Sequence, residues 1–274
     1  MSKNDSVRDQ TIRDFGDQWL SYTNNTGYYN SQALLADILG PEFNITSLRG
    51  SKIIDIGSGT GRIVNMLMST GADKVIAIEP SESFIILKRN TEQFGDTVSC
   101  LNIRGDEIPK GLNADFVISI GVIHHIPDPN PVIKAAFNAL RSGGQIILWV
   151  YGREGNELYL IFTGVLRKLT TKIPHFLLVS LSWIIVEFAG IYSQMCRLFP
   201  LPMNNYFRNV YSKLSWSVKV LIVYDQLNPA YAKYYFKEEA VSLLSGSGFK
   251  KIVCSHRHGY SWTIIGYKPD CELS

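Results

Sequence analysis

A glycine-rich turn, Gly57-Ser-Gly-Thr-Gly61, is the feature of this sequence whose residue types and spacing most clearly point to chemistry. It follows the apolar run Lys52–Ile56 and precedes residues 62–70, which carry apolar side chains at helical spacing. This order predicts a strand, a tight turn and a helix. Such a turn lets the backbone approach a ligand closely and directs the first amides of the helix toward it. The spacing is one residue shorter than the G-x-G-x-x-G pattern that binds a dinucleotide pyrophosphate, and packing alone also produces glycine turns.

Three acidic residues accompany the turn. Asp55 lies inside the preceding strand, two residues before Gly57, and Glu79 ends the next predicted strand, just before Pro80. A carboxylate at that strand end is placed to accept hydrogen bonds from both hydroxyls of a ribose lying across the sheet edge. Asp106 follows the third predicted strand over the same edge, where it could accept a hydrogen bond from an adenine amine. By itself, Asp106 would be interpreted as a turn residue.

His124 and His125 are the strongest candidates for acid-base chemistry. They follow the fourth predicted strand, residues 115–120, where the sheet edge opens. Neighbouring residues rarely face the same way, so at most one imidazole reaches a ligand and no metal site is predicted. A structural role in the loop is the alternative, and we favour His125 for a catalytic one. Tyr224 and Asp225 are further candidates to orient an acceptor, with nothing in their spacing to rank them.

The elements that must hold these residues form an alternating series. Strands buried on both faces and alternating with helices predict a doubly wound, mostly parallel α/β sheet. Two more strands near the C-terminus are joined by only five residues, which forces an antiparallel pair and makes seven strands in all. The predicted strands are residues 52–56, 74–78, 98–103, 115–120, 145–151, 249–255 and 261–267.

This pattern divides the chain into three parts. Residues 1–50 are expected to form an N-terminal helical cap, and residues 51–151 and 237–274 the core that contains the sheet. The sheet does not need residues 152–236, and a structureless loop of that length is improbable, so they are expected to form a helical insertion that acts as an acceptor-binding lid. Within it, an apolar stripe along residues 176–192 predicts a buried or interfacial helix rather than a membrane span.

Composition and charge narrow the function. The chain has 274 residues, 46% of them hydrophobic, which is enough to fill a core. Its net charge of +3 is spread along the chain without a run of five like charges, so nucleic acid is not expected as a partner. Four scattered cysteines argue against a zinc site or a disulfide framework, and the N-terminus lacks the apolar region of a secretory signal. A cytoplasmic location is therefore expected.

Taken together, the glycine turn, the acidic residues at the strand ends and the loop that contains the two histidines resemble the ordered motif set of class I S-adenosylmethionine-dependent methyltransferases. The most similar branch is the ubiquinone/menaquinone-biosynthesis-like one, methyltransferase type 11. The resemblance covers about residues 51–150, and the C-terminal strand pair fits the family's antiparallel hairpin. The chain departs from the family at Ser142, where proline is usual. The motifs that carry the resemblance are Asp55–Gly61, Glu79, Gly105-Asp106, Ser119–Asp128 and Leu140–Gly144.

The resemblance implies S-adenosyl-L-methionine as the cofactor and S-adenosyl-L-homocysteine as the product. It puts Glu79 at the ribose, Asp106 at the adenine and Asp55 near the methionyl part. The implied reaction is an in-line displacement at a sulfonium methyl, which needs mainly alignment and desolvation, with a base only if the acceptor must lose a proton. The residues expected at the cofactor are Asp55, Gly57, Ser58, Gly59, Gly61, Glu79, Pro80, Asp106, Glu107 and Gly121, and those expected at the acceptor are His125, His124 and Tyr224.

The acceptor is expected to be a small or lipophilic molecule, because the insertion is apolar and the chain lacks a basic face. Two alternatives stay open. The chain could bind S-adenosylmethionine without turnover, as a regulatory or partner-binding module, or it could be a nicotinamide-dependent oxidoreductase, which the glycine spacing disfavours. The apolar stripe could be covered by the core, by a second copy in a homodimer or by peripheral contact with a membrane surface, and we favour the first two.

Overall fold

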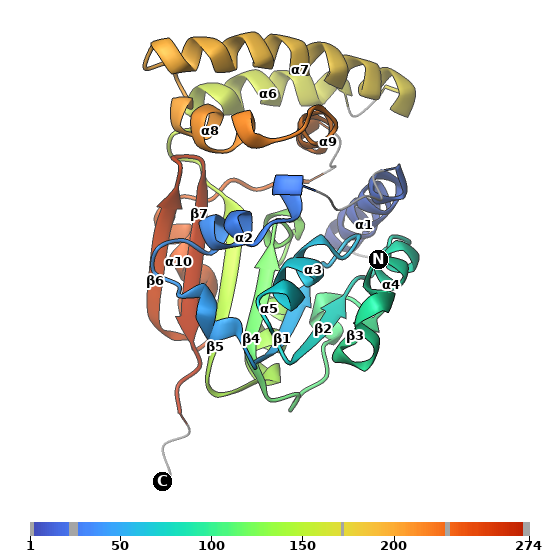
Figure 1. The fold of residues 1–274 in the computed structure, drawn as a ribbon, viewed down its shortest axis with the longest axis vertical. Coiled ribbons are helices and arrows are strands. Elements are labelled where there is room, and N and C mark those ends of the chain that lie inside the picture. The colour runs from blue at the N-terminus through green and yellow to red at the C-terminus, as the bar shows by residue number, and fades with distance from the viewer. Residues whose placement is uncertain (1–2, 22–26, 171–172, 228–230, 271–274) are drawn as a thin grey trace.

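The fold is built around one seven-stranded sheet with the strand order β3-β2-β1-β4-β5-β7-β6 (Figure 1). The structure, a computed structural model, describes residues 3–21, 27–170, 173–227 and 231–270. The first five strands pair in parallel, whereas β7 runs antiparallel to both β5 and β6. This arrangement confirms the predicted fold class. The strands are β1 (Lys52–Ile56), β2 (Lys74–Ile78), β3 (Val98–Leu101), β4 (Ala114–Ile120), β5 (Leu140–Tyr151), β6 (Lys250–Arg257) and β7 (Ser261–Tyr267).

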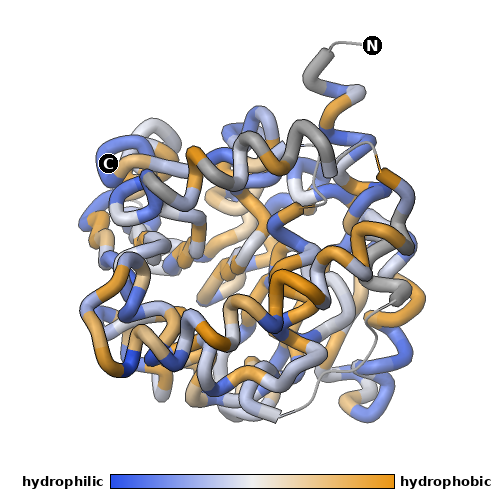
Figure 2. Tube along the Cα trace, turned by 90° about the horizontal axis from the view of Figure 1, so that it is seen from above, coloured by the Kyte–Doolittle hydropathy of each residue, from blue (hydrophilic) through white to orange (hydrophobic). Residues whose placement is uncertain are grey.

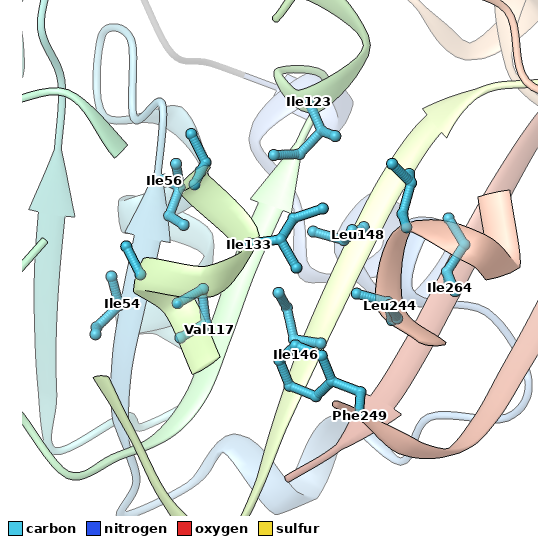
Figure 3. Close-up of a cluster of buried hydrophobic side chains, with 14 of the residues drawn as sticks. Ile54, Ile56, Val117, Ile123, Ile133, Ile146, Leu148, Leu244, Phe249 and Ile264 are labelled. Atoms are coloured by element: carbon cyan, nitrogen blue, oxygen red, sulfur yellow. The ribbon is translucent and has the colours of Figure 1, made fainter. Parts of the chain in front are cut away.

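Helices cover both faces of the sheet. On one face, α2 and α3 pack on alternate strand residues such as Ile53. On the other, α5 and α10 pack on the residues that point the opposite way, such as Ile54 (Figure 3). Because both faces are covered, the parallel strands are apolar on both sides. These helices and their neighbours are α1 (Lys3–Ser21), α2 (Gln32–Leu39), α3 (Arg62–Ser69), α4 (Phe84–Thr91), α5 (Asn130–Ala139) and α10 (Lys237–Ser245).

Four further helices form a layer beyond the carboxyl ends of the parallel strands (Figure 1). We call it the helical layer. It has a small core of its own, in which Leu178, Tyr224 and Leu227 are buried together. Seen from above, the molecule shows hydrophobic segments along the helices nearest the viewer (Figure 2). The layer consists of α6 (Glu157–Thr170), α7 (His175–Leu198), α8 (Asn204–Asn209) and α9 (Trp216–Leu227).

The apolar stripe predicted on residues 176–192 is divided between two faces of α7. Leu178 is 3% exposed, whereas Ile184, Phe188 and Ile191 are 55%, 69% and 63% exposed. The helical layer therefore covers only part of the stripe, and what covers the rest stays open among the core, a second copy and a membrane surface. The reason is geometric: consecutive helix residues are 100° apart, so a stripe that includes adjacent residues is wider than the face its neighbouring helices cover.

Candidate active site

A large cavity opens at the carboxyl ends of the parallel strands. It has a volume of about 1350 Å³ and is lined by residues of the sheet edge, α1 and the helical layer. β1 pairs with β2 on one side and with β4 on the other, so the strand order reverses here. Doubly wound folds bind their ligands at this kind of switch point. A pocket for one ligand usually measures about 300–1,000 Å³, so this cavity has room for two.

The glycine turn contributes to the cavity wall and requires glycine for two reasons. Gly57 has φ +76° and Gly61 has φ +85°, the left-handed region in which other residues are strained. In addition, a Cβ on Gly57 would lie 2.4 Å from Cγ2 of Val122. The amides of Gly57 and Ser58 both donate to the Ile78 carbonyl oxygen, at 2.8 and 3.0 Å, which fixes the turn against the end of β2.

Glu79 joins the end of β2 to the glycine turn. Its Oε2 accepts a hydrogen bond from the Gly59 amide at 2.7 Å, and its Oε1 accepts one from the Ser81 amide at 2.9 Å. The side chain is buried yet lines the cavity. A carboxylate has about four lone-pair sites, so these two bonds leave capacity for hydroxyl donors.

Asp55 is a buried carboxyl group beside the turn. It is 0% exposed, and neither carboxylate oxygen has a hydrogen-bond partner within the described residues. Burial raises the pKa of this carboxyl to about 7. A buried acceptor without a donor costs free energy, so a bound group with N–H or O–H donors would gain a strong partner here.

Asp106 lines the cavity but is already paired. Arg104 donates to both of its carboxylate oxygens, from Nε to Oδ1 at 3.0 Å and from Nη2 to Oδ2 at 3.1 Å. The hydrogen bond from Arg104 lowers the pKa of Asp106. Glu107 accepts a hydrogen bond from the Arg104 amide at 2.9 Å and closes the turn. A ligand amine would therefore have to share the Asp106 carboxylate with Arg104.

The structure brings most of the predicted cofactor residues to one wall. Asp55, Gly61 and Glu107 are not among the described residues that line the cavity: Asp55 and Gly61 lie in or beside the turn, and Glu107 stabilises the loop that carries Asp106. Those that line it are Gly57, Ser58, Gly59, Glu79, Pro80, Asp106 and Gly121.

The two adjacent histidines have different surroundings. His125 lines the cavity, and its Nδ1 lies 2.8 Å from the carbonyl oxygen of Tyr231. Because a carbonyl oxygen only accepts, Nδ1 carries the proton and Nε2 is the basic nitrogen of the neutral ring. His124 is fully buried with its ring centroid 3.8 Å from that of Tyr151, and it is not among the described residues of the cavity wall.

Tyr224 lies in the core of the helical layer, away from the cavity wall. It is 3% exposed and packs with Leu178 and Leu227. Its neighbour Asp225 lines the cavity instead, and the Asp225 Oδ2 accepts a hydrogen bond from the Tyr151 hydroxyl at 3.2 Å. The structure thus disagrees with the choice of Tyr224, because the packing of α9 turns that side chain inward and the next one toward the cavity.

Aromatic side chains form a second group on the cavity wall, and most of them were missed from the sequence. The ring centroids of Tyr206 and Tyr260 are 4.7 Å apart, and those of Trp149 and Tyr151 are 5.5 Å apart. The ring centroids of Phe15, from α1, and His125 are 4.7 Å apart in a T-shaped arrangement. These residues come from α1, β5, α8 and the β6–β7 turn, so only the folded chain brings them together.

A hydrogen-bonded cluster adds polar groups to this aromatic wall. The Gln226 amide donates to the Tyr151 hydroxyl at 2.6 Å, while the Gln226 Oε1 accepts from Tyr159 at 2.9 Å and from Tyr234 at 2.8 Å. All four residues line the cavity. The wall therefore offers flat apolar faces for a ring and polar groups at its edge.

The sheet is doubly wound, with a glycine turn at its switch point and a carboxylate at the end of β2, and antiparallel β7 lies between β5 and β6; this combination is that of a Rossmann-like methyltransferase fold. Residues 54–148 match the family model described as "Methyltransferase domain". Through this domain, the chain is similar to the class I S-adenosylmethionine-dependent methyltransferases of the type 11 branch. S-adenosylmethionine is the cofactor of that family.

Characterised relatives match part of the chain. The tRNA U34 carboxymethyltransferase of Cellvibrio japonicus is 33% identical over 122 residues, which are 42% of this chain and 38% of that protein. The enzyme of the same name from Alteromonas mediterranea is 27% identical over 128 residues, or 44% of this chain and 39% of that protein. The chain thus spans less than half the length of these relatives.

Solved structures share the fold over nearly the whole chain. The 1,6-didemethyltoxoflavin-N1-methyltransferase of Burkholderia thailandensis superposes with a TM-score of 0.57 at 12% identity, covering 98% of this chain and 92% of that one. The magnesium protoporphyrin IX methyltransferase of Synechocystis gives a TM-score of 0.54 at 14% identity, covering 97% and 100%. At such low identity, the similarity establishes the fold alone.

The relatives overturn one expectation from the sequence. The sequence led us to expect a small or lipophilic acceptor and no nucleic acid as a partner. This expectation is wrong as stated, because the relatives are named for action on tRNA. The exclusion rested on a net charge of +3, which averages over the whole chain. Residues 158–224 alone hold seven Lys and Arg against one acid, a formal charge of +6. An average charge therefore concealed a basic segment.

The residues present fit S-adenosylmethionine. The oxygens of Asp55 are buried without partners beside the turn, where they would accept hydrogen bonds from the ammonium group of the amino-acid part, directly or through water. Glu79, on the cavity wall at the end of β2, has the acceptor oxygens that the ribose hydroxyls would need. Gly57, Ser58 and Gly59 of the turn line the cavity at the same place.

Proposed function

We propose that this chain transfers a methyl group from S-adenosylmethionine to an acceptor held against the aromatic wall of the cavity. One observation carries the proposal: a single cavity is lined both by Gly57 and Glu79 and by His125 with its aromatic neighbours. Donor and acceptor must share one site with their reacting atoms in line, and this cavity has room for both.

The cofactor supplies an already activated methyl group on a sulfonium, so the chain must chiefly bind, align and exclude water. Glu79 would hold the ribose hydroxyls while it keeps its bonds to Gly59 and Ser81. Asp55 would accept hydrogen bonds from the amino-acid end, directly or through water. Asp106 would accept one from the adenine amine and keep its pairing with Arg104.

His125 is the proposed proton acceptor. Its Nδ1 proton is donated to the Tyr231 carbonyl oxygen, so Nε2 is the nitrogen that can take a proton from a hydroxyl or N–H acceptor as the methyl group is transferred. His124 would act only through packing, because it is fully buried against Tyr151. Asp225 replaces Tyr224 as the residue of α9 proposed to orient the acceptor.

The helical layer is the proposed acceptor-binding lid. It supplies Tyr206, Asp225 and Gln226 to the cavity wall, whereas the glycine turn and Glu79 come from the core. We keep the division into residues 1–50, 51–151 with 237–274, and 152–236 as part of the proposal. The cytoplasm remains the proposed location, in keeping with the free cysteines Cys100, Cys196 and Cys254.

The proposed acceptor presents a flat ring to the aromatic wall. Aromatic side chains bind planar groups by stacking on them, and the Tyr151–Gln226 cluster offers hydrogen-bonding groups for the edge of such a ring. A nucleobase of a tRNA has this chemistry, and the names of the relatives make tRNA the first acceptor to test. The basic segment of residues 158–224 would attract the phosphate groups of an RNA.

The test is transfer of radiolabelled methyl from S-adenosylmethionine to total tRNA of the source organism. We expect label in the RNA fraction with the wild-type chain and with Glu82→Ala, an exposed carboxylate near the turn, and none with Glu79→Ala. Label transferred only to a cell extract free of RNA would support methyl transfer by this chain but reject tRNA as the acceptor. If the chain binds S-adenosylmethionine but transfers label neither to tRNA nor to the cell extract, the result would favour a regulatory or partner-binding module without turnover.

A further inference from the structure

The outermost helix of the molecule, α7, presents an uncovered apolar face. Its inward face is covered by the helical layer: Leu178, Val186 and Cys196 are at most 3% exposed, and the Tyr211 hydroxyl donates to the Val186 carbonyl oxygen at 3.3 Å. The outward face carries large hydrophobic side chains over the whole length of the helix. They are Leu177, Trp183, Ile184, Phe188, Ile191, Met195 and Leu198, each between 44% and 78% exposed.

Aromatic residues widen this face beyond one helix. Trp216, at the start of α9, is 47% exposed, and its ring centroid lies 5.6 Å from that of Trp183. The Trp216 indole N–H donates to Oε1 of Glu187 at 2.9 Å, so the one acid of residues 158–224 is engaged beside the indole pair. Phe199, directly after the helix, is 56% exposed. Indole rings of this kind are enriched where proteins meet the headgroup level of a bilayer.

The charge of the segment complements an anionic surface. Residues 158–224 carry a formal charge of +6, although the whole chain carries only +3. Arg197, near the end of α7, and Arg208 of α8 are exposed. A basic segment with an exposed apolar face matches the properties of helices that lie in the interface of anionic membranes.

We infer that the outward face of α7, with Trp183 and Trp216, docks this chain onto the surface of a bilayer that contains anionic phospholipids. Within the described residues, one helix, Leu177–Leu198, is long and apolar enough to cross a membrane. It lies in the membrane plane instead, because its inward face packs on the rest of the helical layer. Ile185, Ala189 and Tyr192 of α7 line the cavity, so the cavity lies on the inward side of the docking helix.

Two other occupants fit the face less well. Four exposed residues recur every seven positions, as in a seam between paired helices: Leu177, Ile184, Ile191 and Leu198. However, Trp183, Trp216 and Phe199 lie off that seam, and two copies would bring two basic segments together. An RNA would use the positive charge but would leave the aliphatic side chains uncovered, since its backbone is bound by charged and polar groups.

The experiment is co-sedimentation of the full chain with phosphatidylcholine vesicles, with and without phosphatidylglycerol. We expect binding that requires phosphatidylglycerol and weakens with salt. The double variant Phe188→Ser/Ile191→Ser should bind at least about ten-fold more weakly, because two side chains lose their apolar burial. Ile85→Ser is the matched control, since Ile85 of α4 is 70% exposed and lies outside this face; it should bind like the wild type.

Three results would overturn the inference. The first is that the wild type binds neither kind of vesicle, and the second is that the double variant binds as well as the wild type. The third is that light scattering finds the wild type to be a dimer and the double variant a monomer, while neither protein binds vesicles. Unchanged S-adenosylmethionine affinity in the double variant serves as the folding control, so a loss of vesicle binding cannot reflect a misfolded chain. The outcome does not depend on which acceptor is methylated.

Discussion

The carboxylate of Glu79 accepts a hydrogen bond from the Gly59 amide at 2.7 Å, across a sequence separation of 20 residues. This bond ties the end of β2 to the turn that follows β1. One side chain therefore stabilises the glycine turn and also lines the cavity where a ribose would lie. Binding and local structure are coupled at this residue, which affects how its variants must be designed.

Glu79→Gln should weaken S-adenosylmethionine binding roughly ten- to a hundred-fold. A hydrogen bond that involves a charged group contributes about 1.5–3 kcal/mol, and the amide keeps one oxygen as acceptor so that the turn can persist. Calorimetric titration measures the affinity. Glu82→Gln, at an exposed position, is the control and should bind like the wild type. Equal affinity in both variants would remove Glu79 from the cofactor site.

Asp55 should make the ligand-free chain less stable as the pH rises. Burial raises its folded-state pKa from 3.8 to about 7, so between these values the folded state holds a proton that the unfolded state releases. The free energy of unfolding then falls with rising pH in this window. Asp55→Asn removes the effect and should be more stable than the wild type at about pH 8, by on the order of 1–4 kcal/mol.

Thermal unfolding at about pH 5 and about pH 8 tests this behaviour without ligand. The matched control is Asp73→Asn, at an exposed aspartate, which should keep the pH dependence of the wild type. If Asp55→Asn were also to lose S-adenosylmethionine binding, the buried carboxyl would serve the cofactor as proposed. A wild-type chain whose stability rises across this window relative to Asp55→Asn would contradict the argument.

His125→Ala should lower turnover by about 10²- to 10⁴-fold, the usual contribution of general acid-base catalysis, and leave S-adenosylmethionine affinity unchanged. His124→Ala should instead lower thermal stability, because a fully buried ring that packs against Tyr151 is removed. Turnover and calorimetric affinity are measured on both variants once an acceptor is in hand. Wild-type turnover in His125→Ala would mean that alignment alone performs the reaction.

Gly57→Ala should abolish cofactor binding and lower stability. The new Cβ would lie 2.4 Å from Cγ2 of Val122 and would be held at φ +76°. Gly95→Ala controls for the backbone conformation alone, since Gly95 has φ +54° and open space around it. Adding Val122→Ala to Gly57→Ala should restore part of the binding by relieving the contact. Full binding in Gly57→Ala would show that the turn tolerates a side chain.

The fold, and the gathering of most proposed cofactor residues at one edge of the sheet, were predictable because local signals determine them. A strand buried on both faces, a glycine turn and Glu79 at the next strand end lie within 30 residues, and their spacing alone orders them along one sheet edge. Asp55 could be named from its place in β1, although only the structure shows that both of its oxygens are buried without partners.

The acceptor side was not predictable because packing between distant segments determines it. Tyr224 and Asp225 are adjacent, and the contacts of Tyr224 with Leu178 and Leu227 decide which one faces the cavity. Tyr206 and Tyr260 meet at 4.7 Å from elements more than 50 residues apart. The basic character of residues 158–224 is visible in the sequence, but a net charge taken over the whole chain conceals it.

Native mass spectrometry of the purified wild-type chain, beside Glu79→Gln and Glu82→Gln, tests the central claim most directly. A class I methyltransferase site predicts that the wild type and Glu82→Gln carry a bound mass equal to S-adenosylmethionine or S-adenosylhomocysteine, and that Glu79→Gln carries much less. A wild-type chain that takes up neither molecule when they are added, or that binds a nicotinamide dinucleotide in their place, would contradict the account.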